Sequence, residues 1–170
     1  MYIWDIDGTL LMNKYQTPDW DDPLAIHPQT GEPVTGQMPI YNEGNYLNPD
    51  LEGVNLVIDT VLTARPEYRR SATLEQLKKF TNNTPNTIIM YPSHRRYTHK
   101  AALAYKINHL DFIAHTTAPT TNENIYYIDE DETTRALINI RGLYGLYKTT
   151  QPSRIEAISI DQYFDMEAGK

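Results

Sequence analysis

The chain has 170 residues, of which 40% are hydrophobic and 22% are charged, which fits one globular domain over residues 1–170. Cysteine is absent, which excludes disulfide bonds and thiolate metal sites, and the net charge of -7 argues against a nucleic-acid coat or an anionic membrane surface as partner. Because no apolar run approaches the roughly 18 residues of a membrane span and charged residues follow Met1 closely, we expect no membrane partner, no signal peptide and a cytoplasmic location.

The first predicted strand is the short β-prone run Tyr2–Trp4, which leads into Asp5-Ile6-Asp7-Gly8-Thr9. Gly8 permits a sharp turn, so both aspartates should lie at the carboxyl end of this strand. The alternative is an Asp-Gly turn that closes a strand and has no chemical role.

An irregular segment is predicted over residues 11–53, where Pro, Gly, Asn and Asp are frequent and no periodicity is sustained. Six of the eleven prolines fall between Pro18 and Pro49. We interpret it as an inserted loop or minimal cap, with short β pieces around Ile40 to Tyr46, because long loops in compact domains tend to be functional.

Strands and helices alternate in the rest of the chain. The aliphatic run Val54–Leu62 predicts a buried strand that ends in Thr63-Ala64-Arg65-Pro66, and a helix is predicted over 68–80. A second strand and helix are expected at Thr87–Tyr91 and over 98–109, with Lys100 in the first turn of that helix. This alternation predicts parallel strands joined by right-handed crossovers.

The carboxyl-terminal part continues the alternation. It predicts a short strand at Phe112–Ala114, a strand at Ile125–Ile128 that ends in Asp129, a helix over 133–140, a packed segment at Ile155–Tyr163 and a short tail. The expected fold class is α/β, with an open, mainly parallel Rossmann-like sheet flanked by helices and its site beyond the carboxyl ends of the strands.

A basic segment interrupts the acidic average. Between Arg65 and Lys106 there are nine basic and two acidic residues, a local net charge of +7 that favours an anion-binding face. Solvated helix faces are the alternative, and we prefer that interpretation for Lys78 and Lys79.

Four separated positions together resemble the haloacid dehalogenase superfamily of phosphatases over roughly residues 1–140, the inserted loop excepted. They are the run from Asp5 to Thr9, Thr63, Lys100 and Asp129. The resemblance implies that Asp5 attacks phosphorus and forms an aspartyl-phosphate, and that Asp7 acts as general acid and base.

The same resemblance implies the other roles. Thr63 and Lys100 would contact the phosphoryl group, with Ala64 and Arg65 also at the substrate, and Mg²⁺ would be held by Asp5, Asp7 and Asp129. The second acid of the fourth position stays open between Glu130 and Asp131. The plainer alternatives are a helix N-cap for Thr63, a surface lysine for Lys100 and an acidic helix N-terminus for Asp129. Three further residues near Lys100 could take its role: Arg95, Arg96 and His99.

The substrate is predicted less closely than the reaction. The short insertion and the Thr63–Pro66 stretch look similar to polynucleotide 3'-phosphatase domains and small phage-type nucleotidases, which implies a nucleotide or a nucleic-acid 3'-phosphate end. Basic side chains would bind extra phosphates, and Trp20, Tyr41 and Tyr46 would stack on a base or pack the loop. Two other functions fit the same pattern: a catalytically silent module that binds a phosphorylated ligand, and a phosphotransferase.

Overall fold

The computed structural model of the protein describes residues 1–14, 44–117, 124–141 and 155–170. A five-stranded sheet in the order β5-β4-β1-β6-β7 forms its centre, and all four neighbouring pairs of strands are parallel. The strands are β1 (Tyr2–Trp4), β4 (Thr60–Pro66), β5 (Thr87–Tyr91), β6 (Ile125–Ile128) and β7 (Ile155–Ile158). The predicted open, Rossmann-like α/β sheet is confirmed.

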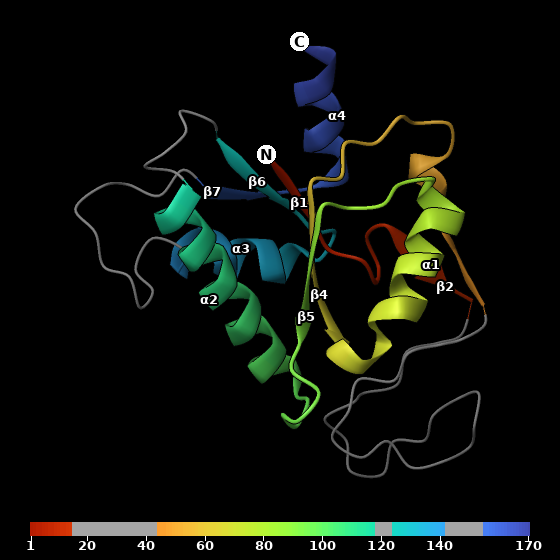
Figure 1. Cartoon of the computed structure of the whole chain (residues 1–170). Helices are drawn as coiled ribbons and strands as arrows, with labels where there is room; N and C mark the ends of the chain where they lie inside the picture. Colours follow the sequence, from red (N-terminus) through yellow and green to blue (C-terminus); the bar gives the residue numbers. More distant parts are fainter. Residues whose placement is uncertain (15–43, 118–123, 142–154) are drawn as a thin grey trace.

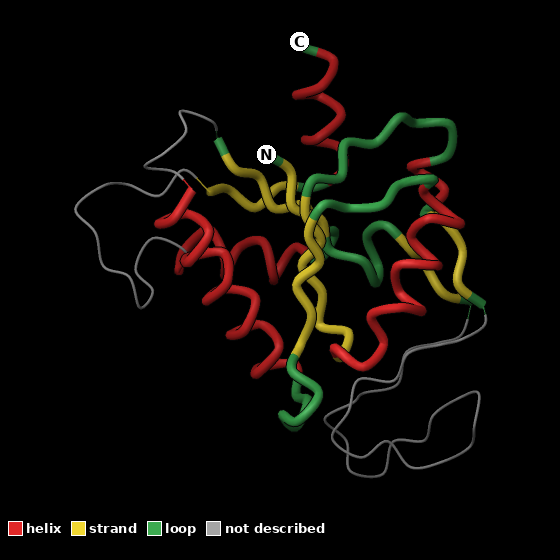
Figure 2. The backbone as a smooth tube through the Cα atoms, viewed as in Figure 1, coloured by secondary structure: helices red, strands yellow, loops and turns green. Residues whose placement is uncertain are grey.

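Helices cover both faces of this sheet (Figures 1 and 2). They are α1 (Arg70–Thr81), α2 (His99–Thr117), α3 (Glu132–Arg141) and α4 (Ile160–Ala168). Side chains alternate along each strand, so Trp4 packs with Leu77 and Tyr163 on the face of α1 and α4, whereas Ile3 packs with Leu110 on the face of α2 and α3. Among the described helices, none has the length and apolar character to cross a membrane.

The two ends of the predicted insertion pair with each other. Strand β2 (Leu11–Asn13) lies antiparallel to β3 (Asn45–Leu47), and a 3₁₀ turn, η1 (Pro49–Leu51), follows. Tyr46 lies in β3 with its side chain exposed, so one of the short β pieces expected here is confirmed. Trp20 and Tyr41, and the cap itself, fall on residues 15–43, outside the described part of the chain.

Three sequence-based expectations are wrong. The strand predicted at Val54–Leu62 forms at Thr60–Pro66 instead, because residues 54–58 leave the sheet: the indole N–H of Trp4 donates to the carbonyl of Val57 (2.8 Å). Phe112–Ala114 lies within α2 and forms no strand, since a short apolar triplet does not distinguish a helix from a strand. The expected terminal tail belongs to α4, whose start is fixed by a Ser159–Gln162 capping box.

The segment between β4 and α1 also differs in detail. A 3₁₀ turn, η2 (Glu67–Arg69), separates the strand from the helix, so α1 begins two residues later than the predicted start at Tyr68. Pro66 is the last residue of β4 and not a helical residue. Residues 63–65 therefore belong to β4 and to the central sheet.

Candidate functional site

The order of the strands brings two acidic residues together. From β1 the chain runs outward to β4 and β5 and then returns to β6 on the other side of β1, so the site lies where the strand order reverses. Asp5 directly follows β1 and Asp129 directly follows β6, and the backbone N–H of Asp5 donates to the carbonyl of Ile128 (3.0 Å). Both side chains are buried.

A glycine turn fixes the direction of Asp5 and its neighbours. Gly8 has a φ of 82°, and the N–H of Thr9 donates to the carbonyl of Ile6 (3.1 Å), which closes the turn. The hydroxyl of Thr9 then donates to Oδ2 of Asp5 (3.2 Å) and accepts the N–H of Glu130 (3.2 Å). Thr9 thereby ties the turn after β1 to the end of β6.

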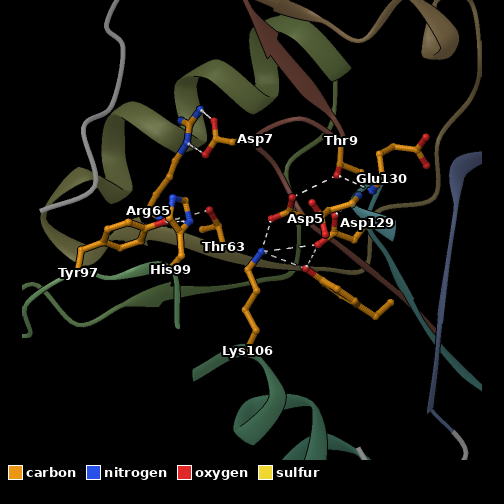
Figure 3. A network of polar contacts seen from close by, with 12 residues as sticks. Asp5, Asp7, Thr9, Thr63, Arg65, Tyr97, His99, Lys106, Asp129 and Glu130 are labelled. Atoms are coloured by element: carbon orange, nitrogen blue, oxygen red, sulfur yellow. Dashed lines mark hydrogen bonds and ion pairs between the residues drawn. The ribbon is translucent and has the colours of Figure 1, made fainter. Parts of the chain in front are cut away.

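Lys106, and not Lys100, is the lysine that contacts Asp5 (Figure 3). Its Nζ lies 2.7 Å from Oδ1 of Asp5 and 3.9 Å from Oδ2 of Asp129, and the residue is buried. Lys100 lies in the first turn of α2, as predicted, but it is exposed. Six residues advance a helix by about 9 Å, so the two ammonium groups lie well apart along α2. The expectation that Lys100 lies against Asp5 is therefore corrected.

The carboxylate of Asp7 is held by Arg65. Nε of Arg65 donates to Oδ2 of Asp7 (2.9 Å) and Nη2 donates to Oδ1 (2.8 Å), a bidentate pair. The third nitrogen, Nη1, donates to Gln76 (2.7 Å) and reaches the hydroxyl of Thr73 (3.4 Å). Arg65 is 1% exposed, whereas the Asp7 side chain is 35% exposed. All three guanidinium nitrogens therefore have partners inside the protein. In this state Arg65 holds Asp7 and has no nitrogen left for a substrate.

Thr63 lies inside β4, the strand next to β1, and is buried. Its hydroxyl accepts the backbone N–H of Arg65 (3.1 Å), and no helix begins there, so the helix N-cap interpretation is excluded. Figure 3 shows Tyr97 and His99 near Thr63. His99 is one of the three alternatives to Lys100 named from the sequence, whereas Tyr97 had no role assigned. Ala64 is half-buried in the same strand, and its predicted substrate contact stays a prediction.

Both candidates for a second acid after Asp129 have structural partners. Oδ1 of Asp131 accepts the N–H of Thr134 (2.6 Å) and so caps the start of α3, whereas the carboxylate of Glu130 accepts the N–H of Ile160 (2.6 Å). Asp129 itself accepts two hydrogen bonds, from the N–H of Asp131 (2.8 Å) and from the hydroxyl of Tyr127 (2.9 Å). Asp129 is the acid of this segment that reaches the charged cluster.

No protein-family model, curated protein or solved structure matches this chain.

Burial and charge together raise the pKa of Asp5 to about 7. Burial is the largest cause, Lys106 opposes it, and the negative charge of Asp129 adds to it. Burial alone would lower the pKa of Lys106, but Asp5 and Asp129 more than offset this and raise it. With Asp5 ionised, the cluster has two carboxylates, Asp5 and Asp129, against the single positive charge of Lys106.

This excess negative charge fits a hard divalent cation. Carboxylate oxygens are the ligands that Mg²⁺ prefers, and Asp5 and Asp129 supply them. No group of three or more acidic or histidine side chains is arranged around a metal position within the described ranges, because the carboxylate of Asp7 faces Arg65. Asp5 and Asp129 are the two carboxylates that would hold such an ion, and Asp7 would join them only after leaving Arg65.

The raised pKa of Asp5 predicts that stability falls as pH rises in the absence of metal. Between pH 3.8 and about 7 the folded protein holds a proton on Asp5 that the unfolded chain has lost, so raising the pH favours unfolding in this window. One pKa unit corresponds to about 1.4 kcal/mol, so the loss can reach about 4 kcal/mol. Urea unfolding in EDTA from pH 4.5 to 7.5 measures it.

The matched reference for this experiment is Asp5→Asn, which cannot titrate. The unfolding free energy of the wild type should drop more steeply across the window than that of the variant. Equal slopes for the two proteins would contradict the raised pKa.

Proposed function

We propose that the chain is a Mg²⁺-dependent phosphomonoesterase of the haloacid dehalogenase type, with Asp5 as the nucleophile. The observation that carries the proposal is the environment of Asp5: a buried carboxylate after the central strand, with Lys106 on Oδ1 and Thr9 on Oδ2. A buried carboxylate oriented by two donors is suited to attack an electrophile. The substrate we propose is a nucleotide or a nucleic-acid 3'-phosphate end.

The first step forms a bond between a carboxylate oxygen of Asp5 and phosphorus and breaks the bond from phosphorus to the leaving oxygen. Asp7, which takes up a proton from solvent once its ion pair with Arg65 has opened, gives that proton to the leaving oxygen. In the second step Asp7 takes a proton from water, whose oxygen bonds to phosphorus, and inorganic phosphate leaves Asp5 as a free carboxylate. Lys106 offsets the negative charge that gathers at Asp5 in both steps.

A bound Mg²⁺, held by Asp5 and Asp129, would reduce the repulsion between the Asp5 carboxylate and the phosphate dianion. The other contributions come from the chain itself. To act as an acid, Asp7 must first break its ion pair with Arg65. A bound phosphoryl group would help to break this pair, because it is a second anion that competes with Asp7 for the guanidinium. The partly exposed side chain of Asp7 can then turn to the leaving oxygen.

A basic loop beside the site supports a substrate with several phosphates. We use this name for residues 94–100, which follow β5 and include the first two residues of α2. They contain five exposed basic side chains: His94, Arg95, Arg96, His99 and Lys100. In the described part of the chain, Arg95, Arg96 and Lys100 form no ion pair, whereas Arg65, Arg70 and Lys106 all do. Part of the excess positive charge of the basic segment is thus displayed on this loop, and another part on Lys78 and Lys79 at the end of α1.

An exposed aromatic ring lies next to the basic loop. Tyr68 is 56% exposed, its N–H donates to the hydroxyl of Ser93 (2.9 Å), and the guanidinium of Arg69 lies 5.9 Å from its ring centroid. Exposed aromatic rings beside cationic side chains are typical of surfaces that bind single-stranded nucleic acid. Tyr68 is therefore a further candidate for stacking on a base, beside Trp20 and Tyr41, which lie outside the described residues.

Phosphate release from a substrate panel tests the proposal. The panel contains p-nitrophenyl phosphate, nucleoside 3'- and 5'-monophosphates and a 3'-phosphorylated oligonucleotide, each with Mg²⁺ and with EDTA. We expect release with Mg²⁺ from every class, loss of release in EDTA, and the highest kcat/KM for the oligonucleotide. No release from any of them would leave a silent phospho-ligand-binding module, and transfer to added alcohols in preference to water would indicate a phosphotransferase.

Paired variants test the contribution of the basic loop. Arg95→Ala/Arg96→Ala should raise the KM for the oligonucleotide roughly tenfold at low salt and leave that for p-nitrophenyl phosphate unchanged, because only the longer substrate places phosphates on the loop. Lys78→Ala/Lys79→Ala removes the same charge from exposed positions at the end of α1 and is the matched control. Equal effects of the two pairs would show a general charge effect.

A further inference from the structure

Tyr127 contributes a hydroxyl group to the charged cluster from within the core. It lies in β6 with an exposure of 0%, and its ring packs on the α2 and α3 face of the sheet with Ile107 and Leu110. Its neighbour Tyr126 points to the other face, where its ring lies 5.9 Å from that of Tyr2. An aliphatic residue would fill the position of Tyr127 without placing a polar atom beside Asp5, Lys106 and Asp129.

The hydrogen bonds of the Tyr127 hydroxyl can only run in one direction. The ammonium of Lys106 has donors and no acceptor, so its contact with the hydroxyl oxygen (3.1 Å) uses a Lys106 proton. The hydroxyl proton is therefore directed to Oδ2 of Asp129 (2.9 Å). Tyr127 thus accepts a hydrogen bond from the cation and donates one to the anion.

The distances within the cluster show the effect of this arrangement. Lys106 Nζ is 2.7 Å from Asp5 but 3.9 Å from Oδ2 of Asp129, the oxygen that Tyr127 already satisfies. Removing the hydroxyl would leave that buried oxygen without its donor, which is costly for a carboxylate. Lys106 is the cation that lies close enough to replace the donor, and moving to Asp129 would take it from Asp5.

We propose that Tyr127 is a positioning residue, whose hydroxyl keeps Lys106 on the nucleophile and leaves Asp129 available to a metal ion. The expected effect of Tyr127 on catalysis rests on the proposed function. The structural part of the inference, the placement of Lys106, stands apart from any reaction. The hydroxyl satisfies Asp129, so the two carboxylates do not compete for the single ammonium group of Lys106.

The test compares Tyr127→Phe with Tyr126→Phe, which removes the neighbouring hydroxyl on the opposite face. A crystal structure of Tyr127→Phe should show Lys106 Nζ in direct contact with Asp129 and withdrawn from Asp5. Calorimetric titration with Mg²⁺ should show about tenfold weaker binding, and kcat for p-nitrophenyl phosphate should fall about 10- to 100-fold with KM within about twofold. Tyr126→Phe should match the wild type in all three.

The outcomes separate this inference from the proposed function. If Lys106 keeps its place in Tyr127→Phe, or if the two variants behave alike, the positioning role is overturned. If the wild type releases no phosphate, the proposed function fails while the crystal structure still decides the placement of Lys106. If Tyr127→Phe does not fold, the double variant Tyr127→Phe/Asp129→Asn decides. Restored folding supports the role, because the negative charge that lost its donor is then removed, and continued misfolding overturns it.

Discussion

Asp5→Asn is expected to abolish phosphate release. The amide has nearly the shape of the carboxylate but is a far weaker nucleophile toward phosphorus, so the aspartyl-phosphate cannot form. Turnover of p-nitrophenyl phosphate with Mg²⁺ should fall by a factor on the order of a thousand or more. The amide oxygen of the variant can still accept from Lys106, so the far-ultraviolet circular dichroism of the folded variant should match that of the wild type.

Asp161→Asn is the matched control for this prediction. Asp161 is an exposed aspartate in the first turn of α4, and the same change there should leave kcat/KM within about twofold. Metal-dependent turnover that survives Asp5→Asn would contradict Asp5 as the nucleophile. A second carboxylate would then have to be the attacking group, and Asp129 is the nearest buried candidate.

The strands at the centre of the sheet were predictable because their sequences allow little else. Tyr2–Trp4, Thr87–Tyr91 and Ile125–Ile128 form strands with the predicted bounds. Each is short, apolar and bounded by polar or turn-forming residues. Since parallel strands place their carboxyl ends at one edge, the meeting of Asp5 and Asp129 followed from these bounds together with the strand order.

Residues 54–58 could not be placed from the sequence in the same way. Their aliphatic character is that of a buried strand, but the N–H of Val57 donates to the hydroxyl of Tyr163 (3.2 Å), far along the chain. Such a long-range partner leaves no local signal. The pair between Asp7 and Arg65 likewise depends on the distance between β1 and β4, which no spacing within the sequence records.

One error had a signal that could have prevented it. In a helix, residues four apart share a face, and Lys106 falls between Ala102 and Leu110 on the buried face of α2. Lys100 instead shares its face with Ala104 and Asn108, both exposed. A lysine on an apolar helical face requires a buried partner, whereas a first-turn lysine does not. The periodicity of the helix thus indicated Lys106, while the order of the motifs favoured Lys100.

Lys106→Met is expected to have the second-largest effect on activity. Methionine nearly matches the length of lysine but has no charge, so Asp5 and Asp129 would lose the buried ammonium that offsets their repulsion. We expect kcat/KM for p-nitrophenyl phosphate to fall on the order of a hundredfold, the effect typical of removing one preorganised electrostatic contact. The unfolding free energy at neutral pH should fall by about 3 kcal/mol, because a buried ion pair is broken by the loss of one partner.

Lys100→Met makes the identical chemical change at the exposed start of the same helix. It should leave kcat/KM within about twofold and the unfolding free energy within about 0.5 kcal/mol. Urea unfolding and steady-state kinetics on both variants measure these differences, and the contrast isolates position from charge. If Lys100→Met lowers kcat as strongly as Lys106→Met, the first-turn lysine must reach the substrate during turnover. In that case the contact between Lys106 and Asp5 would serve to stabilise the buried carboxylates and not to promote the reaction.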